Sequence, residues 1–266
     1  MGCAVLHTVK KLDGCRILAT DGAIGSVKEV YFDDEQWVVR YLEVDAGGWL
    51  ARRSVLISPY AVKFIAWDTR AIAVNLTRDQ VQRSPDIDTD KPVSRQREAE
   101  YHHYYDYPQY WPYSAYWAWG AIPLVIPPNA QVRAEAEAHR RADAAFDSAD
   151  AHLRSSTAVT GYRIQASDQL IGHVADFLFD EETWAIRYLI VDTHNWLPGK
   201  HVLVAPEWTR AVNWGERTVS IALTRAEIER SPEYDPHHLP SPDYETALHE
   251  HYSRGTNVTD ASHERR

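Results

Sequence analysis

The chain has 266 residues, of which 44% are hydrophobic and 25% charged, as in an ordinary globular protein with one or two domains. Its formal net charge of −10 disfavours binding to nucleic-acid phosphates or anionic lipids, although a local basic patch would escape this argument. Only two cysteines are present, Cys3 and Cys15, and both lie near the N-terminus, so a disulfide framework is not indicated.

The N-terminal region, residues 1–18, lacks the continuous apolar core of a signal peptide. The most apolar stretch, residues 118–126, is much shorter than the roughly 20 residues of a membrane-spanning helix, and Pro127 and Pro128 follow it. We therefore expect a cytoplasmic protein without a transmembrane segment. Peripheral attachment to the inner face of the membrane stays open.

The chain contains an internal duplication. Residues 14–105 recur without a gap as residues 161–252, so adding 147 to a position gives its counterpart, and 35 of the 92 aligned positions are identical. The identical pairs include Gly25 and Gly172, Trp37 and Trp184, Arg40 and Arg187, Pro59 and Pro206, and Thr77 and Thr224. So many matches indicate a tandem duplication of one small domain.

Six short strands and a helix are predicted in each repeat, because short apolar runs alternate with turn residues. Thr77 is the expected N-cap of a helix at residues 78–83, which Pro85 ends, and a second helix is expected to begin at Ser94 and, in the other repeat, at Ser241. In the first repeat the strands are expected at residues 16–20, 24–32, 37–44, 55–58, 60–67 and 71–76.

This pattern favours a mainly β fold of two tandem, antiparallel, six-stranded barrels, because a barrel leaves no exposed edges. The strand at residues 37–44 is apolar on both faces, with Val38 and Leu42 on one and Trp37 and Tyr41 on the other. One face can fill a barrel, whereas the other needs cover from the terminal helix or the sister repeat. We therefore expect the repeats to pack on each other as a pseudo-dimer within one chain.

Four segments are predicted along the chain. They are a barrel with its terminal helix at residues 14–105, a linker at 106–160 with an aromatic, Pro-rich part and an Ala/Glu/Arg-rich helix, a second barrel with its helix at 161–252, and a disordered tail at 253–266.

Four motifs mark the strands of the first repeat and return in the second. They are Gly25-x-Val27, the acidic hairpin Asp33-Asp34-Glu35, Trp-x-x-Arg-Tyr-Leu-x-Val-Asp from Trp37, and Val-Leu-x-x-Pro from Val55. In order and spacing these motifs resemble the PRC-barrel family. The resemblance covers residues 14–88 and 161–235 and implies a six-stranded barrel. The family includes the cytoplasmic domain of the photosynthetic reaction centre H subunit and the C-terminal domain of a ribosome maturation factor, where the barrel is not itself an enzyme.

Charged residues that both repeats share have two interpretations. The resemblance to the H subunit implies a part in proton delivery to a quinone. An architectural role is the alternative, because Asp carboxylates accept backbone N–H bonds in turns and an Arg on an apolar face needs a carboxylate partner. Repetition favours architecture, since one proton path does not need two copies. These residues are Asp33, Arg40, Asp45, Asp180, Arg187 and Asp192.

The sequence indicates no catalytic residue, metal site or cofactor. The thirteen histidines do not form the His-Glu-x-x-His spacing, and the histidine clusters have no cysteine partner that would complete a zinc site. Neither a Gly-x-Ser-x-Gly turn nor a Gly-rich phosphate loop occurs. We therefore expect a protein that is not an enzyme; a deep pocket lined by titratable groups with perturbed pKa values would revive the enzyme hypothesis.

The stretch between the repeats is rich in aromatic residues. Tyr and Trp combine a large apolar area with a polar group, which suits an interface. Stacking on single-stranded nucleic acid and insertion at a membrane surface are disfavoured, because no Lys or Arg occurs between Tyr104 and Val132. Packing between the barrels and docking of an external partner stay open. The candidate interface residues are Tyr107, Tyr110, Trp111, Tyr113, Tyr116, Trp117 and Trp119.

The functional expectation is a non-enzymatic module that binds or stabilises a protein complex. By resemblance to the H subunit, this would be an electron-transfer complex of the reaction-centre type at the membrane face. The resemblance to the ribosome maturation factor implies an alternative, in which the barrel binds a ribosomal protein. The acidic charge of the chain argues against direct RNA contact in either case.

Overall fold

The computed structural model shows a mainly β protein with two seven-stranded sheets of the same strand order. It describes residues 5–50, 53–85, 95–108, 110, 153–193 and 200–260. The described residues fall into two compact units: unit 1 takes those within Met1–Cys15, Ser26–Leu42 and Arg154–Arg266, and unit 2 those within Arg16–Gly25 and Glu43–Leu153. Unit 1 therefore combines the second repeat with the N-terminal segment and one hairpin tip of the first repeat.

The first sheet has the strand order β5-β4-β3-β2-β7-β6, and its strands lie close to the positions predicted from the sequence. They are β2 (Arg16–Ala19), β3 (Gly22–Asp33), β4 (Val38–Asp45), β5 (Ser54–Ile57), β6 (Val62–Ala66) and β7 (Ala71–Val74).

The second sheet repeats this order as β12-β11-β10-β9-β14-β13. Its strands are β9 (Arg163–Gln165), β10 (Leu170–Asp180), β11 (Ile186–Asp192), β12 (His201–Val204), β13 (Thr209–Asn213) and β14 (Thr218–Ile221).

The pairing departs in one respect from the predicted antiparallel barrel. β2 and β7 pair in parallel, with Ile17 opposite Ile72, and β9 and β14 do the same, with Ile164 opposite Val219. The cause is the link between β5 and β6, a single turn of 3₁₀ helix at Pro59–Ala61, η3. β5 and β6 are the two end strands of this order, so the chain passes from one end of the sheet to the other at η3. After β6, β7 lies beside β2 and runs in the same direction as β2.

A seventh strand in each sheet also corrects the predicted count of six. β1 (Leu6–Thr8) pairs antiparallel with β10, Leu6 lying opposite Asp180, and β8 (Leu153–Ser155) pairs with β3. β1 and β8 are 147 residues apart, so each repeat adds its first strand to the sheet of the other. Sequence comparison missed this exchange because only Leu6 and Leu153 are identical across the two strands.

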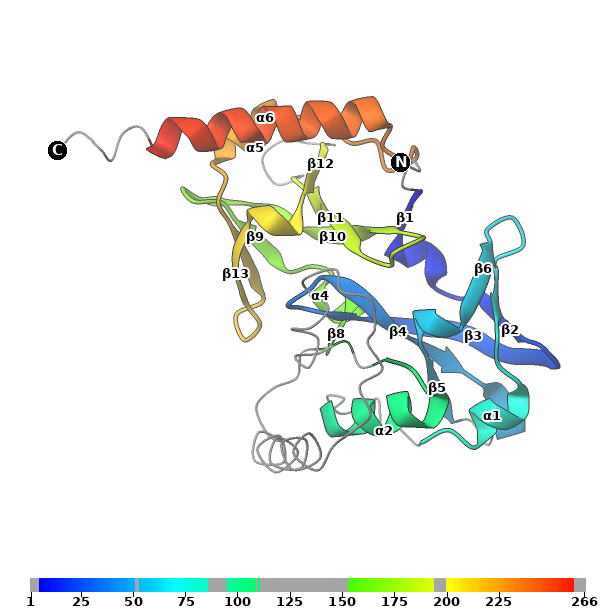
Figure 1. The fold of residues 1–266 in the computed structure, drawn as a ribbon. Coiled ribbons are helices and arrows are strands. Elements are labelled where there is room, and N and C mark those ends of the chain that lie inside the picture. The colour runs from blue at the N-terminus through cyan, green and yellow to red at the C-terminus, as the bar shows by residue number, and fades with distance from the viewer. Residues whose placement is uncertain are drawn as a thin grey trace, which may run out of the picture. The chain divides into compact units, whose positions relative to one another are not determined.

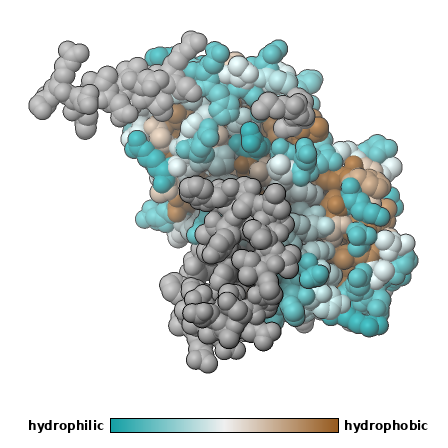
Figure 2. All heavy atoms as spheres, in the orientation of Figure 1, coloured by the Kyte–Doolittle hydropathy of each residue, from teal (hydrophilic) through white to brown (hydrophobic). Residues whose placement is uncertain are grey.

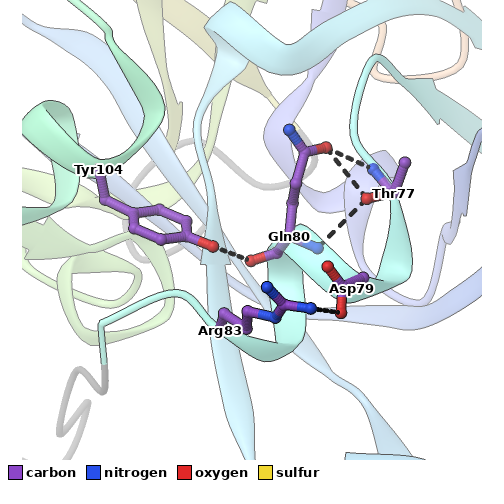
Figure 3. Close-up of polar contacts among 5 residues, drawn as sticks. All are labelled: Thr77, Asp79, Gln80, Arg83 and Tyr104. Atoms are coloured by element: carbon purple, nitrogen blue, oxygen red, sulfur yellow. Dashed lines mark hydrogen bonds and ion pairs between the residues drawn. The ribbon is translucent and has the colours of Figure 1, made fainter.

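Helices connect or follow several of the strands. Thr77 caps α1 with a capping box formed with Gln80, which confirms the predicted N-cap (Figure 3). Its counterpart Thr224 caps α5 in the same way with Glu227. Besides η3, the helical segments are η1 (Val9–Leu12), η2 (Gly47–Leu50), α1 (Arg78–Gln82), α2 (Arg95–Tyr105), α4 (Ser156–Val159), η5 (Pro206–Trp208), α5 (Arg225–Arg230) and α6 (Pro242–Asp260).

The terminal helices supply the cover that the apolar sheets require. α6 runs along the second sheet in Figure 1, and its Leu248 and Tyr252 are buried. In unit 2 the hydroxyl of Tyr101 on α2 donates to Leu56 O at 2.9 Å and accepts from Ser58 N at 3.1 Å, so α2 is bonded to the end of β5. Burial of these side chains stabilises each repeat by about 2 kcal/mol per side chain.

At one position in each repeat, steric crowding requires a glycine. A Cβ on Gly25 would lie 1.9 Å from Asp45 O, and one on Gly172 would lie 2.1 Å from Asp192 O. Gly172 also has a φ of 156°, which side chains rarely adopt. The two crossing strands approach so closely here that only glycine fits.

Candidate functional site

Asp33 and Asp180 organise the hairpins at the ends of β3 and β10. Asp33 Oδ1 accepts the N–H groups of Glu35 at 3.0 Å and Gln36 at 2.9 Å. Asp180 Oδ1 accepts those of Glu182 at 2.8 Å and Thr183 at 3.2 Å. Both carboxylates thus hold a turn, which is the architectural role considered for them.

The other repeated charges lie nearer the surface. Arg40 donates through Nη2 to the amide oxygen of Gln36 at 2.6 Å, whereas its counterpart Arg187 is exposed. Asp45 Oδ1 accepts Gly47 N at 2.9 Å. Asp192 lies 3.7 Å from His173 Nε2. Arg40 and Arg187 therefore differ in exposure, and the structure does not gather the repeated charges into one site.

The exchanged strands carry a pair of matching contacts that the sequence did not reveal. His7 Nε2 on β1 lies 3.0 Å from Glu181 Oε2, and Arg154 Nε on β8 lies 2.7 Å from Asp34 Oδ2. Each pair joins the first strand of one repeat to the hairpin of the other, at positions 147 residues apart. The Arg154 guanidinium also lies over the Trp214 ring, 4.1 Å from its centroid.

A second matched contact caps the short helix after each exchanged strand. Asp176 Oδ1 accepts Lys10 N at 3.3 Å, and its counterpart Glu29 accepts Thr157 N at 3.3 Å. Glu29 also accepts the Ser156 hydroxyl at 2.9 Å. Burial raises the pKa of Asp176 to about 6, because removal from water disfavours the carboxylate. The exchange is therefore fixed by reciprocal polar contacts as well as by strand pairing.

The hairpin tips meet inside unit 1. Val39 N donates to Trp184 O at 2.9 Å, and Ile186 N donates to Trp37 O at 2.7 Å, so the two bonds are again counterparts. Trp37 and Trp184 have φ values of 55° and 60°, a left-handed conformation that turns each strand out of its hairpin. Phe32 and Phe177 pack at 5.4 Å between ring centroids beside this contact.

Two of the seven predicted interface aromatics, Tyr107 and Tyr110, lie within the described residues, and both pack on the first repeat. Tyr107 stacks on Tyr105 at 5.4 Å, and the buried Tyr110 donates its hydroxyl to Glu98. The Tyr104 hydroxyl on α2 donates to Gln80 O on α1 at 2.8 Å, which joins the two helices (Figure 3). The remaining five predicted residues, Trp111, Tyr113, Tyr116, Trp117 and Trp119, lie outside the described residues, as does most of the helix predicted before Leu153.

A related group of polar side chains lies in the second repeat. The Tyr188 hydroxyl donates to Glu245 Oε2 at 3.0 Å and lies 3.0 Å from His249 Nε2. Burial, helped by the charge of Glu245, raises the pKa of Tyr188, so its hydroxyl keeps the proton that it donates. His249 Nδ1 lies 3.6 Å from Glu207 Oε1. Glu245 and His249 are the counterparts of Glu98 and His102.

The described residues contain no group of three or more His, Cys, Asp or Glu side chains arranged to hold a metal ion. No helix within the described part of the chain is long and apolar enough to cross a membrane.

An exposed apolar strand distinguishes the first repeat from the second. The Phe64 side chain on β6 is 61% exposed, and Tyr60 just before the strand is 52% exposed. At the counterparts of Phe64 and Tyr60 the second repeat has Ala211 on β13 and Glu207 before the strand. Figure 2 shows hydrophobic residues gathered on the side of the molecule where Figure 1 places β6.

Comparison with protein families matches the first repeat to the PRC-barrel domain. The match covers residues 6–81, starting at the first residue of β1 and ending within α1. The second PRC-barrel-like repeat follows from the 147-residue offset and from the identical strand order of its sheet. No curated protein matches the sequence.

The PRC-barrel match begins before the stretch in which the two repeats share frequent identities. That stretch starts at Gly14 and Gly161, after the exchanged strands, so the duplication gave no signal for His7, Arg154 or the caps at Lys10 and Thr157. Extending the same offset backwards to Leu6 and Leu153 would have placed β8 as the counterpart of β1. Nothing in the sequence would have shown that the two strands change sheets.

Proposed function

We propose that this tandem PRC-barrel protein is a non-enzymatic module that binds a protein partner along β6 of the first repeat. The observation that carries the proposal is the exposure of Phe64 on a strand at the end of the sheet order. Because an end strand offers backbone hydrogen bonds, an extended segment of a partner can pair with it. Phe64 and Tyr60 would then supply apolar contact beside the added strand.

The second repeat supports this interpretation by contrast. β13 is also an end strand and carries Arg210 where β6 carries Lys63, but it has Ala211 in place of Phe64 and Asn213 in place of Ala66. It therefore offers less apolar contact to an added strand. Both strands keep the same pairing with their neighbours, β7 and β14. The difference in side chains is therefore not required by the fold, which favours a role in recognition for the apolar copy.

The resemblance to the H subunit supports an electron-transfer complex at the cytoplasmic face of the membrane as the partner. The resemblance to the ribosome maturation factor supports a ribosomal protein as the partner instead. Separating membrane, soluble and ribosomal fractions of cells by centrifugation would distinguish these partners, because the protein should travel with the one it binds.

The test uses the full-length tagged protein, crosslinked in cells and purified under denaturing conditions. Phe64→Asp should lose at least tenfold of the captured partner, because a charge at the centre of the strand opposes pairing and removes an apolar contact. Ala211→Asp places the same charge at the equivalent, exposed position of β13 and should leave the yield unchanged. Equal capture by the wild type and Phe64→Asp, or no captured protein at all, would contradict the proposal.

A further inference from the structure

In the first repeat, the chain that follows α2 folds back over the polar side chains of that helix. Asp106 has a φ of 57° and ends α2, and Tyr107 N donates back to His102 O at 2.8 Å. The chain therefore reverses. His102 Nδ1 donates to Pro108 O at 2.8 Å, and the Tyr110 hydroxyl donates to Glu98.

This reversal buries the polar side chains of α2. Glu98 and His102 are both 1% exposed. A buried carboxylate needs hydrogen-bond donors, and the phenol of Tyr110 provides one to Glu98. In the first repeat, a tyrosine of the chain itself is thus bound at this carboxylate.

The second repeat has the same carboxylate and imidazole without the reversal. The counterpart of Asp106 is Ser253, and α6 continues through it to Asp260, into the segment from residue 253 that was predicted to be a disordered tail. His249 consequently has a side chain that is 42% exposed. Among the described residues, Glu245 accepts the Tyr188 hydroxyl and has no counterpart of Tyr110.

Trp208 limits what can enter this site. Its ring lies 4.4 Å from the ring of Tyr252 and 5.4 Å from that of His249. In the first repeat, Tyr107 makes the matching contacts with Tyr105 and His102. Trp208 therefore replaces Tyr107 in the second repeat, and only the position of Tyr110 has no replacement among the described residues.

We propose that Glu245, His249, Trp208 and Tyr188 form a binding site for one tyrosine side chain of an extended partner segment. The phenol hydroxyl of that tyrosine donates to the Glu245 carboxylate, which can accept several hydrogen bonds, and its ring packs against His249 as Tyr110 packs against His102 at 5.6 Å. These residues differ from those of β6, so the site is a second point of recognition whose test is independent of the first.

The test uses the full-length protein and a peptide with the sequence of residues 106–110, Asp-Tyr-Pro-Gln-Tyr, blocked at both ends. The imidazole resonances of His249 are assigned by their loss in His249→Gln and followed by NMR during titration. The peptide should shift them saturably. A peptide with Phe as its last residue should bind at least fivefold more weakly, because it lacks the hydroxyl that donates to a charged acceptor.

Two protein variants locate the binding. Glu245→Gln keeps the shape of the side chain but removes its charge. It should lower the affinity for the tyrosine peptide by about fivefold to tenfold. Glu250→Gln removes the same charge from an exposed position on the same helix and should not change the affinity. Circular dichroism verifies that both variants are folded. The proposal is overturned by the absence of a saturable shift, by equal binding of the two peptides, or by equal effects of the two variants.

Discussion

The terminal helices of the two repeats begin alike and end differently. Glu98, His102 and Tyr105 on α2 recur as Glu245, His249 and Tyr252 on α6. α2 stops at a left-handed Asp106 and its chain folds back over the polar groups, whereas α6 continues to Asp260. The difference teaches that a duplicated set of side chains can be structural in one copy and accessible in the other.

The strand-exchange contacts show the opposite behaviour. The pairs His7 with Glu181 and Arg154 with Asp34 use different residue types at matched positions, yet both join a first strand to the hairpin of the other repeat. The geometry is kept while the chemistry changes. The comparison therefore distinguishes positions that stabilise the fold in both repeats from positions whose role differs between the repeats. Variants at both kinds of position test this distinction.

The largest effect is expected where both copies are under the same steric constraint. Gly25→Ala and Gly172→Ala should each destabilise the protein by about 3 kcal/mol or more, because the added Cβ would overlap a backbone carbonyl. Urea unfolding measures the change. Gly48→Ala, where no atom lies within 4 Å of the new Cβ, is the control and should change stability by less than about 0.5 kcal/mol. A mild effect at either strand glycine would show that the strands can separate there.

Tyr110→Phe tests whether the first repeat depends on its own closure. Removal of the hydroxyl leaves the buried Glu98 without this donor and should cost about 2 kcal/mol. Tyr104→Phe removes a hydrogen bond made by an exposed ring of the same helix and should cost about 0.5 kcal/mol. Thermal unfolding of both variants decides the matter, and equal losses would contradict the special role of Tyr110.

Asp176→Asn should stabilise the protein at neutral pH. The folded pKa of Asp176, about 6, lies above the value of about 3.9 in an unfolded chain, so the folded state binds this proton more tightly. The carboxylate therefore lowers stability above pH 6, and this penalty disappears below pH 4. We expect a gain of about 1 kcal/mol at pH 7 and none at pH 4 by urea unfolding.

Glu29→Gln is the matched control for that variant, since Glu29 is the counterpart of Asp176 and also accepts the Ser156 hydroxyl. It should bring no gain at pH 7. If both variants stabilise equally, the two caps are electrostatically equivalent and the proposed difference is wrong.

The smallest effect concerns His7. Burial lowers its pKa below the ordinary 6.5, although Glu181 opposes this shift. The unfolded chain then binds the proton more tightly, so the contribution of His7 to stability is complete above pH 6.5 and is lost as the pH falls further. His7→Gln should flatten the loss of stability between pH 7 and 5 by a few tenths of a kcal/mol. Arg154→Gln at the equivalent position should leave the pH slope as in the wild type.

Much of the fold was predictable because its signals are local. Alternating apolar residues located the six strands of each repeat, and Thr77 and Thr224 located two helix starts. The turn role of Asp33 also follows from short-range chemistry, since its carboxylate bonds to residues two and three positions away. The roles of Tyr107 and Tyr110 were less accessible, because their partners depend on the reversal at Asp106.

The sequence by itself determined the duplication, the family resemblance and the strand pattern, since each depends on residue identity and spacing along the chain. Only the tertiary structure decided which sheet each first strand joins and which carboxylate is covered. A three-residue strand has too few side chains to specify its partner, and the contacts that do so, such as those of His7 and Asp176, join residues more than 160 positions apart. Long-range packing therefore distinguishes two copies that their sequences present as equivalent.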